Sequence, residues 1–226
     1  YEAGTRFTVL DGMLNADFAT FYYDYTDKQL KGIVLTQVLG PLPELVNIPK
    51  SYVYGFEANI ALQPVKGLRL KSGVTYVHSK VLSDPVAPAV PRNPFGVPIS
   101  YVGDSFPNTP KWQVVGDAEY RFPVGSSGMH ATIGAGLTYY SSSPGTFGNT
   151  PLFTLPAYTL LDARLGLESR DGRWNAQIWG HNITNEYYYN NVTHLTDYIS
   201  KIAAMPVTYG ISVSYKYRIV RSSCSK

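Results

Sequence analysis

The alternation of apolar and polar residues near the end of the chain predicts a long β-strand. From Val207 to Tyr217, every odd-numbered residue is apolar or aromatic, and every even-numbered residue is small or polar. Successive side chains of a strand point to opposite faces, so one face of this segment is wholly apolar. The eleven residues of the segment match a tilted strand that crosses a bilayer, which needs about 9–11 residues.

The same period of two recurs along the rest of the chain. Eight further segments show it, within residues 1–9, 14–22, 54–62, 68–76, 112–122, 131–139, 161–167 and 174–180. Nearly every charged residue within the nine predicted strands falls on the face opposite the apolar one. The pattern predicts an all-β antiparallel protein, although a soluble sandwich and a membrane barrel share this alternation.

The lengths of the connections favour the barrel. Four connections are tight, at residues 11–12, 64–67, 123–128 and 169–172, and the four between them are long, at residues 26–50, 81–110, 141–157 and 185–206. Short turns at one end and long loops at the other are typical of outer-membrane barrels. A soluble sandwich has no reason to sort its loops strictly by length.

Aromatic residues on the apolar face fall at two levels. Trp112 and Tyr120 are eight residues apart, as are Tyr209 and Tyr217. At ~3.3 Å per residue, this separation is about 26 Å along the strand. With a tilt of ~40° it covers roughly 20 Å of depth, which is near the ~25 Å apolar band between the aromatic girdles of a barrel.

Composition adds limits on class and partners. Charged residues are 15% of the chain, well below the roughly 25% of soluble domains. The net charge of +3 is small and spread along the sequence, so we expect no nucleic-acid partner. The four histidines lack metal-ligand spacing and there is one cysteine, so we expect no metal site, no cofactor and no catalytic residue.

The direction of the strands indicates an incomplete barrel. If the short turns are periplasmic, the first and last strands both run inward, which requires an odd number of strands. Complete bacterial single-chain barrels have even counts, and open sheet edges leave backbone groups unsatisfied in lipid. We therefore expect the C-terminal part of a larger barrel. The alternatives are a complete small barrel of about ten strands, acting as a passive pore or surface enzyme, and a soluble binding or structural β protein.

Four segments resemble the C-terminal barrel of TonB-dependent outer-membrane receptors. They are Phe21 to Gln29, Asn47 to Glu57, Tyr158 to Tyr187 with its Trp179-Gly180-His181-Asn182 stretch, and Pro206 to Tyr217. The resemblance implies a 22-stranded barrel closed by an N-terminal plug domain. Residues 1–217 would supply about its last nine strands, without the plug. It also implies that residues 40–45 form the tip of a long extracellular hairpin.

The resemblance further implies a function. Receptors of this family import scarce ligands, often ferric siderophores, with energy delivered by TonB, and they are not enzymes. The implied location is the outer membrane of a Gram-negative bacterium. The implied partners are the lipid bilayer, the absent plug and barrel strands, the TonB complex through that plug, and a small-molecule ligand. Family barrels stop at a terminal aromatic where Tyr217 stands, so we expect residues 218–226 to be an atypical, disordered tail.

Two sets of candidate site residues follow. The polar parity of the strands predicts that seven charged residues line the lumen: Glu57, Arg69, Asp117, Glu119, Arg121, Asp162 and Arg164. The last long loop carries the candidates for ligand binding, which are Tyr187, Tyr188 and His194.

Overall fold

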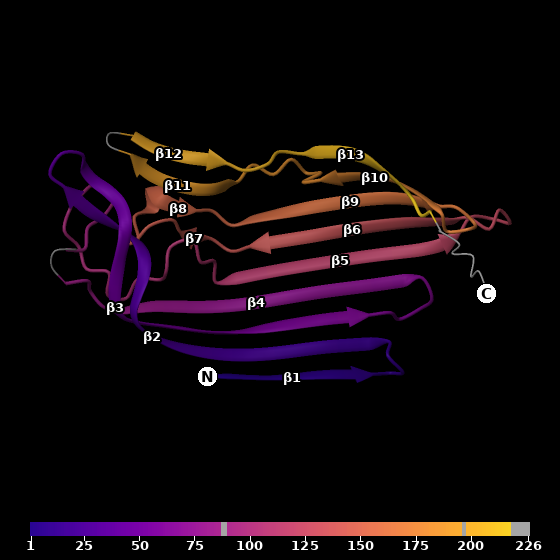
Figure 1. Ribbon diagram of the computed structural model, residues 1–226, viewed down its shortest axis with the longest axis horizontal. Helices are drawn as coiled ribbons and strands as arrows, with labels where there is room; N and C mark the ends of the chain where they lie inside the picture. Colours follow the sequence, from indigo (N-terminus) through magenta and orange to yellow (C-terminus); the bar gives the residue numbers. More distant parts are fainter. Residues whose placement is uncertain (87–89, 196–197, 218–226) are drawn as a thin grey trace, which may run out of the picture.

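The computed structural model of the protein describes residues 1–86, 90–195 and 198–217. Its main unit is a nine-stranded sheet in which all neighbouring strands are antiparallel. The strands are β1 (Glu2–Val9), β2 (Leu14–Thr36), β3 (Gly40–Leu62), β4 (Leu68–Ser83), β5 (Trp112–Pro123), β6 (His130–Tyr140), β9 (Tyr158–Glu168), β10 (Trp174–His181) and β13 (Thr208–Tyr215). The nine predicted strands are therefore confirmed in their predicted order (Figure 1).

The connections are sorted by length, as the sequence predicts. Figure 1 shows the tight turns together at one end of the sheet and the long loops at the other. In the β1–β2 turn, Leu10, Asp11 and Gly12 all have positive φ, and the Met13 N–H donates to the Leu10 carbonyl (3.0 Å). Asp and Gly tolerate this conformation, so the Asp-Gly pair fixes the turn at this point.

Strands β2 and β3 extend far beyond their neighbours as one hairpin. Their antiparallel ladder extends from the pair Leu14 and Leu62 to the pair Thr36 and Gly40, which confirms the long hairpin. The predicted tip at residues 40–45 is wrong, because these residues begin β3 and the turn lies at 37–39. The Thr36 hydroxyl closes that turn by donating to the Gly40 carbonyl (2.9 Å) and accepting from the Leu39 N–H (3.1 Å).

The outer face of the sheet is apolar and exposed. One row across five strands consists of Tyr120, Ile133, Leu165, Ile178 and Ile211, and every member is exposed. A soluble protein would cover such a continuous apolar surface, whereas a barrel in lipid presents it to acyl chains. We call this side of the sheet the apolar face and the opposite side the polar face.

Strands β1 and β13 form the two edges of the sheet. No ladder joins them within the described residues, and no tenth strand completes the sheet there. The short strands of the loops pair only with each other: β7 (Ser143–Pro144) with β8 (Thr154–Leu155), and β11 (Tyr189–Leu195) with β12 (Tyr198–Ala203). A short 3-10 helix, η1 (Pro151–Phe153), precedes β8. Over the same residues, no helix is long and apolar enough to cross a membrane.

The closing strand is shorter than predicted. Strand β13 spans Thr208–Tyr215 rather than 207–217, because its ladder partner β10 begins at Trp174, opposite Tyr215. Tyr217 follows the strand and is exposed. The predicted tail at residues 218–226 lies outside the described residues.

The buried core lies where the far ends of β3 and β4 meet the long loops. It comprises Val46, Ile48, Val81, Tyr101, Phe106 and Phe147. These residues come from β3, from the end of β4, and from the loops that follow β4 and β6. We call this packed region, formed by the extended β2–β3 hairpin and the long loops, the loop cap.

Candidate ligand-binding face and loop cap

The charged residues predicted to line a lumen share the polar face. Two neighbouring rows across β4, β5, β6 and β9 hold most of them, with Lys71, Asp117, Gly136 and Asp162 in one row and Arg69, Glu119, Gly134 and Arg164 in the next. Arg121 lies further along β5, and Glu57 lies on β3 opposite Thr75. The register therefore places five of the seven side by side.

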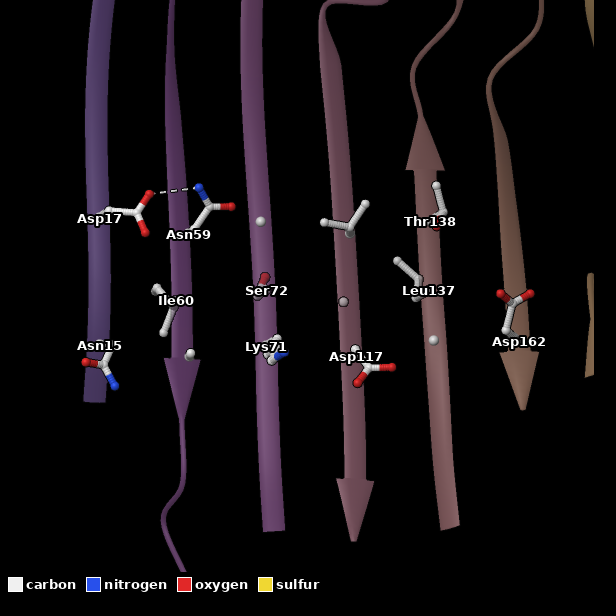
Figure 2. A pocket seen from close by; sticks show the side chains of 15 residues that line it. Asn15, Asp17, Asn59, Ile60, Lys71, Ser72, Asp117, Leu137, Thr138 and Asp162 are labelled. Atoms are coloured by element: carbon white, nitrogen blue, oxygen red, sulfur yellow. Dashed lines mark hydrogen bonds between the residues drawn. The ribbon is translucent and has the colours of Figure 1, made fainter. Parts of the chain in front are cut away.

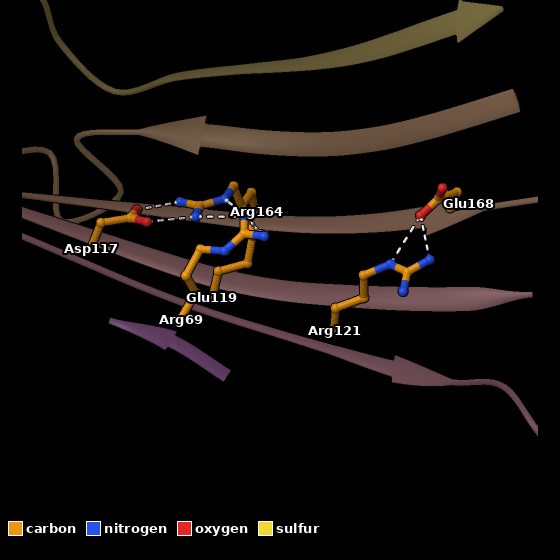
Figure 3. A network of polar contacts seen from close by, with 6 residues as sticks. All are labelled: Arg69, Asp117, Glu119, Arg121, Arg164 and Glu168. Atoms are coloured by element: carbon orange, nitrogen blue, oxygen red, sulfur yellow. Dashed lines mark hydrogen bonds and ion pairs between the residues drawn. The ribbon is translucent and has the colours of Figure 1, made fainter. Parts of the chain in front are cut away.

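Arg164 is the centre of an ion-pair network on this face (Figure 3). Its guanidinium donates to both oxygens of Asp117, with Nη1–Oδ2 at 2.7 Å and Nη2–Oδ1 at 3.0 Å, and Nη2 also lies 3.0 Å from Glu119 Oε2. The arginine reaches β5 from β9 by lying over Gly134 on β6. A Cβ atom at Gly134 would stand 2.6 Å from Arg164 Cζ, so glycine at this position leaves room for the network.

Two further ion pairs extend the network. Arg69 Nη1 lies 3.8 Å from Glu119 Oε1. Arg121 reaches Glu168 on β9 across β6, with Nη2–Oε2 at 2.9 Å and Nε–Oε2 at 3.0 Å. Each of the three arginines on this part of the polar face therefore has a carboxylate partner, and these ion pairs hold the long arginine side chains against the sheet.

A hollow of about 510 Å³ lies on the polar face beside this network. Its lining residues come from β2, β3, β4, β5, β6 and β9, and Figure 2 shows the polar ones together with Ile60 and Leu137. Asn59 donates to Asp17 (2.9 Å) at one side, and Asp117 and Asp162 lie at the other. Lys71 is the basic residue of the lining. The hollow therefore presents mixed charge beside apolar side chains such as Val115.

Asp162 connects the polar face to the last long loop. Its Oδ2 lies 2.9 Å from His181 Nδ1, and its Oδ1 accepts the Asn182 N–H (3.0 Å). The buried Asn182 side chain then accepts the Glu186 N–H (2.8 Å) and donates to the Met205 carbonyl (3.3 Å). These bonds fix both ends of the loop to β10. Among the described residues, no group of three or more His, Cys, Asp or Glu could hold a metal ion.

Tyr101 holds three parts of the loop cap together. Its fully buried ring stacks on Phe147 with centroids 4.4 Å apart. Its hydroxyl accepts the Ile33 N–H (3.2 Å) and the Arg92 N–H (3.2 Å), and it donates to the Arg92 carbonyl (2.7 Å). One side chain thus joins the extended hairpin to the loops after β4 and β6. Burial raises the pKa of the Tyr101 phenol, so the hydroxyl stays protonated at neutral pH.

Asp104 ties the same two loops together through its carboxylate. Oδ2 accepts the Gly148 N–H (2.6 Å), and Oδ1 accepts from Asn149 Nδ2 (2.6 Å). Burial raises the pKa of Asp104, the hydrogen bond from Gly148 opposes that rise, and the charge of Asp84 adds to it. The loops of the cap are therefore cross-linked by specific polar contacts rather than lying loose over the sheet.

An aromatic recess of about 270 Å³ opens where β6 and β9 meet the loop cap. Tyr140, Tyr158 and Tyr189 line it together with Asn190. The Tyr158 ring packs between Tyr140 (5.3 Å) and Tyr188 (4.3 Å). Aromatic walls with a few amide and hydroxyl groups are what small-molecule sites generally present.

The structure separates the three residues predicted to bind ligand. Tyr188 stacks against the recess. Tyr187 is 71% exposed and packs edge-on to Tyr189. His194 is only 8% exposed and contacts the rings of Phe95 and Phe153. The sequence did not single out Tyr101, Asp104 or Tyr140, because their roles depend on loops that meet only in three dimensions.

The sequence matches the family described as TonB dependent receptor-like, beta-barrel, over residues 1–199. Solved structures of receptors also share the fold. The siderophore receptor PiuA from Acinetobacter baumannii superimposes with a TM-score of 0.70 at 21% identity, covering 96% of this chain and 28% of that chain.

Two more receptors give similar values. The ferric yersiniabactin uptake receptor FyuA from Yersinia pestis has a TM-score of 0.72 at 18% identity, with 96% of this chain and 29% of that chain covered. The ferric preacinetobactin receptor BauA from Acinetobacter baumannii has a TM-score of 0.66 at 21% identity, with 95% of this chain and 28% of that chain covered. The chain thus spans less than a third of the length of these structures, and likeness at this identity concerns the fold.

Proposed function

The chain belongs to the TonB-dependent receptor-like β-barrel family, and from that membership we propose that it forms part of an outer-membrane receptor for a scarce ligand such as a ferric siderophore. The receptor takes up this ligand with energy from TonB. Residues 1–217 are the C-terminal segment of its barrel. In this proposal the apolar face meets the lipid of a Gram-negative outer membrane, and the polar face lines the lumen.

The open sheet carries this proposal. Strands β1 and β13 both have unpaired edges within the described residues, while the apolar face between them is suited to lipid. Open edges cannot stay in a bilayer, because their backbone N–H and C=O groups find no water there. Further strands of a larger barrel satisfy both edges. The coverage of less than a third of each compared receptor supports the same arrangement.

The ligand enters from the side of the loop cap. The aromatic recess between Tyr140, Tyr158 and Tyr189 lies where the cap meets the polar face, so a ligand held there stands at the mouth of the lumen. Flat aromatic and polar groups of the recess suit a ligand that combines both characters, as iron chelators do. The name of one compared structure, a siderophore receptor, supports this class of ligand.

The charged residues of the polar face contact the plug domain. Arg69, Arg121 and Arg164 are held in place by carboxylates of the same sheet, so they form a fixed wall. The mixed charges of the neighbouring hollow offer partners to a polar domain inside the lumen. Energy from TonB reaches the barrel through that plug.

Iron-limited growth tests the proposal. The full-length receptor carrying this chain is expressed in a Gram-negative strain that lacks its own siderophore receptors, and ferric hydroxamates and ferric catecholates are supplied in turn. We expect growth on at least one of them, with loss of that growth when TonB is deleted. Equal growth without TonB would indicate a passive pore, and growth on none would remove siderophores as the ligand class.

A matched pair of variants tests the recess. Tyr158→Ala removes a wall of the recess, whereas Tyr198→Ala changes an exposed tyrosine of β12. We expect the first variant to weaken ligand binding at least tenfold and the second to leave it unchanged. Equal binding by both would place the ligand elsewhere.

A further inference from the structure

Two lysines and a histidine lie together on the apolar face, at the end of β3 and β4 that is nearer the loop cap. His78 and Lys80 follow Tyr76 at two-residue steps along β4, so they share its outward face. Tyr52 is the ladder partner of Lys80. Lys50, two residues before Tyr52, is exposed. Lys50 is a diagonal neighbour of Lys80, because it stands two residues from Tyr52, the ladder partner of Lys80. His78 packs against the Tyr52 ring.

An aromatic row fixes the level of this group. Tyr76 packs against Trp112 (4.7 Å between centroids) and Phe56 (5.8 Å), and His78 packs against Tyr54 (4.9 Å). Trp and Tyr collect at the boundary between hydrocarbon and headgroups. Lys80 lies about 13 Å beyond Tyr76 along the strand, at ~3.3 Å per residue. Its ammonium therefore reaches the level of the lipid headgroups.

The two lysines have no carboxylate partner in the part of the chain that the structure describes. No Asp or Glu oxygen there lies within 4.0 Å of the Lys50 or Lys80 amine. Arg69, Arg121 and Arg164 of the polar face are, in contrast, each paired with a carboxylate. Asp24, the ladder partner of Tyr52 on β2, is a diagonal neighbour of Lys50 but stands on the side of Tyr52 away from Lys80. An anion is therefore attracted to the β3–β4 side.

We propose that Lys50, His78 and Lys80 form a binding site for the phosphate group of a membrane lipid on the outer surface of the barrel. The two ammonium groups supply charge and hydrogen-bond donors to phosphate oxygens. The rings of Tyr52 and Tyr54 pack against His78, with centroids 6.1 and 4.9 Å away. The lipid chains then lie along the aromatic row below. This site rests on the membrane location proposed above, but it does not involve the transported ligand.

Lipid titration of the purified full-length receptor tests the site. Native mass spectrometry counts bound molecules of a synthetic diacyl phosphate lipid and of a diacylglycerol with the same chains. We expect the phosphate lipid to bind and the uncharged lipid to bind at least tenfold more weakly. The double variant Lys50→Gln/Lys80→Gln should lose about tenfold or more in affinity for the phosphate lipid.

The control variant Lys31→Gln/Lys66→Gln removes the same charge from the extended hairpin and from a tight turn, and it should bind normally. Lys50→Arg/Lys80→Arg should also retain binding, which shows that the site and not folding is measured. Equal loss in the control, or equal binding of both lipids, would overturn the proposal. Displacement of the lipid by an equal concentration of inorganic phosphate would also overturn it, because the site would then not depend on the lipid. Siderophore-dependent growth is scored separately, so failure of transport does not affect this result.

Discussion

The guanidinium of Arg164 binds both carboxylate oxygens of Asp117, at 2.7 and 3.0 Å, although β6 lies between their strands. The contact is possible because Gly134 has no side chain under the arginine. Arg164 on β9 can therefore hold the carboxylate of Asp117 on β5, two strands away. This geometry makes a glycine in the strand, rather than a charged residue, the position to test.

Gly134→Ala should displace Arg164 from its carboxylates, because the new Cβ would lie 2.6 Å from Cζ. Gly136→Ala, two residues along the same face, meets its nearest atom at 3.5 Å and serves as the control. Since the network is partly exposed, we expect a loss of only about 1 kcal/mol in unfolding free energy for the first variant. Urea unfolding of the refolded receptor measures it, and equal stability of both variants would contradict the role of Gly134.

Reversal of a single charge tests whether the polar face meets the plug. Glu57 is exposed on this face, and none of the ion pairs between described residues includes it. Glu57→Lys should slow TonB-dependent uptake several-fold, because it reverses a charge that the proposed function places opposite the plug. Glu44→Lys, an exposed position of the loop cap, is the control. Unchanged uptake rates in the Glu57 variant would remove this residue from the plug interface.

The cap should loosen when the Tyr101 hydroxyl is removed. Tyr101→Phe leaves the Ile33 and Arg92 N–H groups without their acceptor, and an unsatisfied buried group costs about 1–3 kcal/mol. Hydrogen exchange at residues 31–34 and 91–93 should accelerate by roughly ten- to a hundredfold. Tyr198→Phe changes an exposed ring and should exchange like the wild type. Unaltered exchange in the first variant would show that the hydroxyl does not hold the cap.

Acidity should affect the cap through Asp104. Burial raises the pKa of this carboxyl above its ordinary 3.8, so the folded cap binds its proton more tightly than the opened cap. The stability that this group contributes is fully present below pH 3.8 and is lost as pH rises through the raised pKa. Exchange at residues 141–150, corrected for intrinsic rates, should therefore report easier opening at about pH 7 than at about pH 4.

Asp104→Asn removes the titrating group and isolates its part of that pH dependence. In the variant, opening at residues 141–150 should depend less on pH than it does in the wild type. An identical pH profile in the variant would assign the effect to groups other than Asp104.

The strands were predictable because their signal is local. A period of two fixes which face each side chain occupies, so the sequence placed Asp117, Glu119 and Arg164 on one side before any pairing was known. The register between neighbouring strands, in contrast, was not predictable from the pattern within each strand. The crossing of Arg164 over Gly134 depends on which residues face each other on three strands, and no single strand contains that information.

The loops were predictable in length but not in structure. The long hairpin was expected from the resemblance, yet its turn lies at 37–39 because Thr36 and Gly40 close it locally. The burial of Tyr101 and His194 results from contacts between loops distant in sequence. Such contacts leave no periodic pattern in the sequence. Neither the central place of Tyr101 in the loop cap nor the burial of His194 could therefore be predicted from it.

The orientation of the two faces decides whether this sheet is a membrane barrel wall, and a nitroxide scan of β13 in the reconstituted full-length receptor measures it. Labels are placed one at a time at residues 211, 212, 213 and 214, with native cysteines replaced. We predict that 211 and 213 collide with oxygen dissolved in lipid, while 212 and 214 collide with a water-soluble nickel complex. Equal accessibility of all four to the nickel complex, or the reverse alternation, would contradict a barrel with its apolar face in lipid.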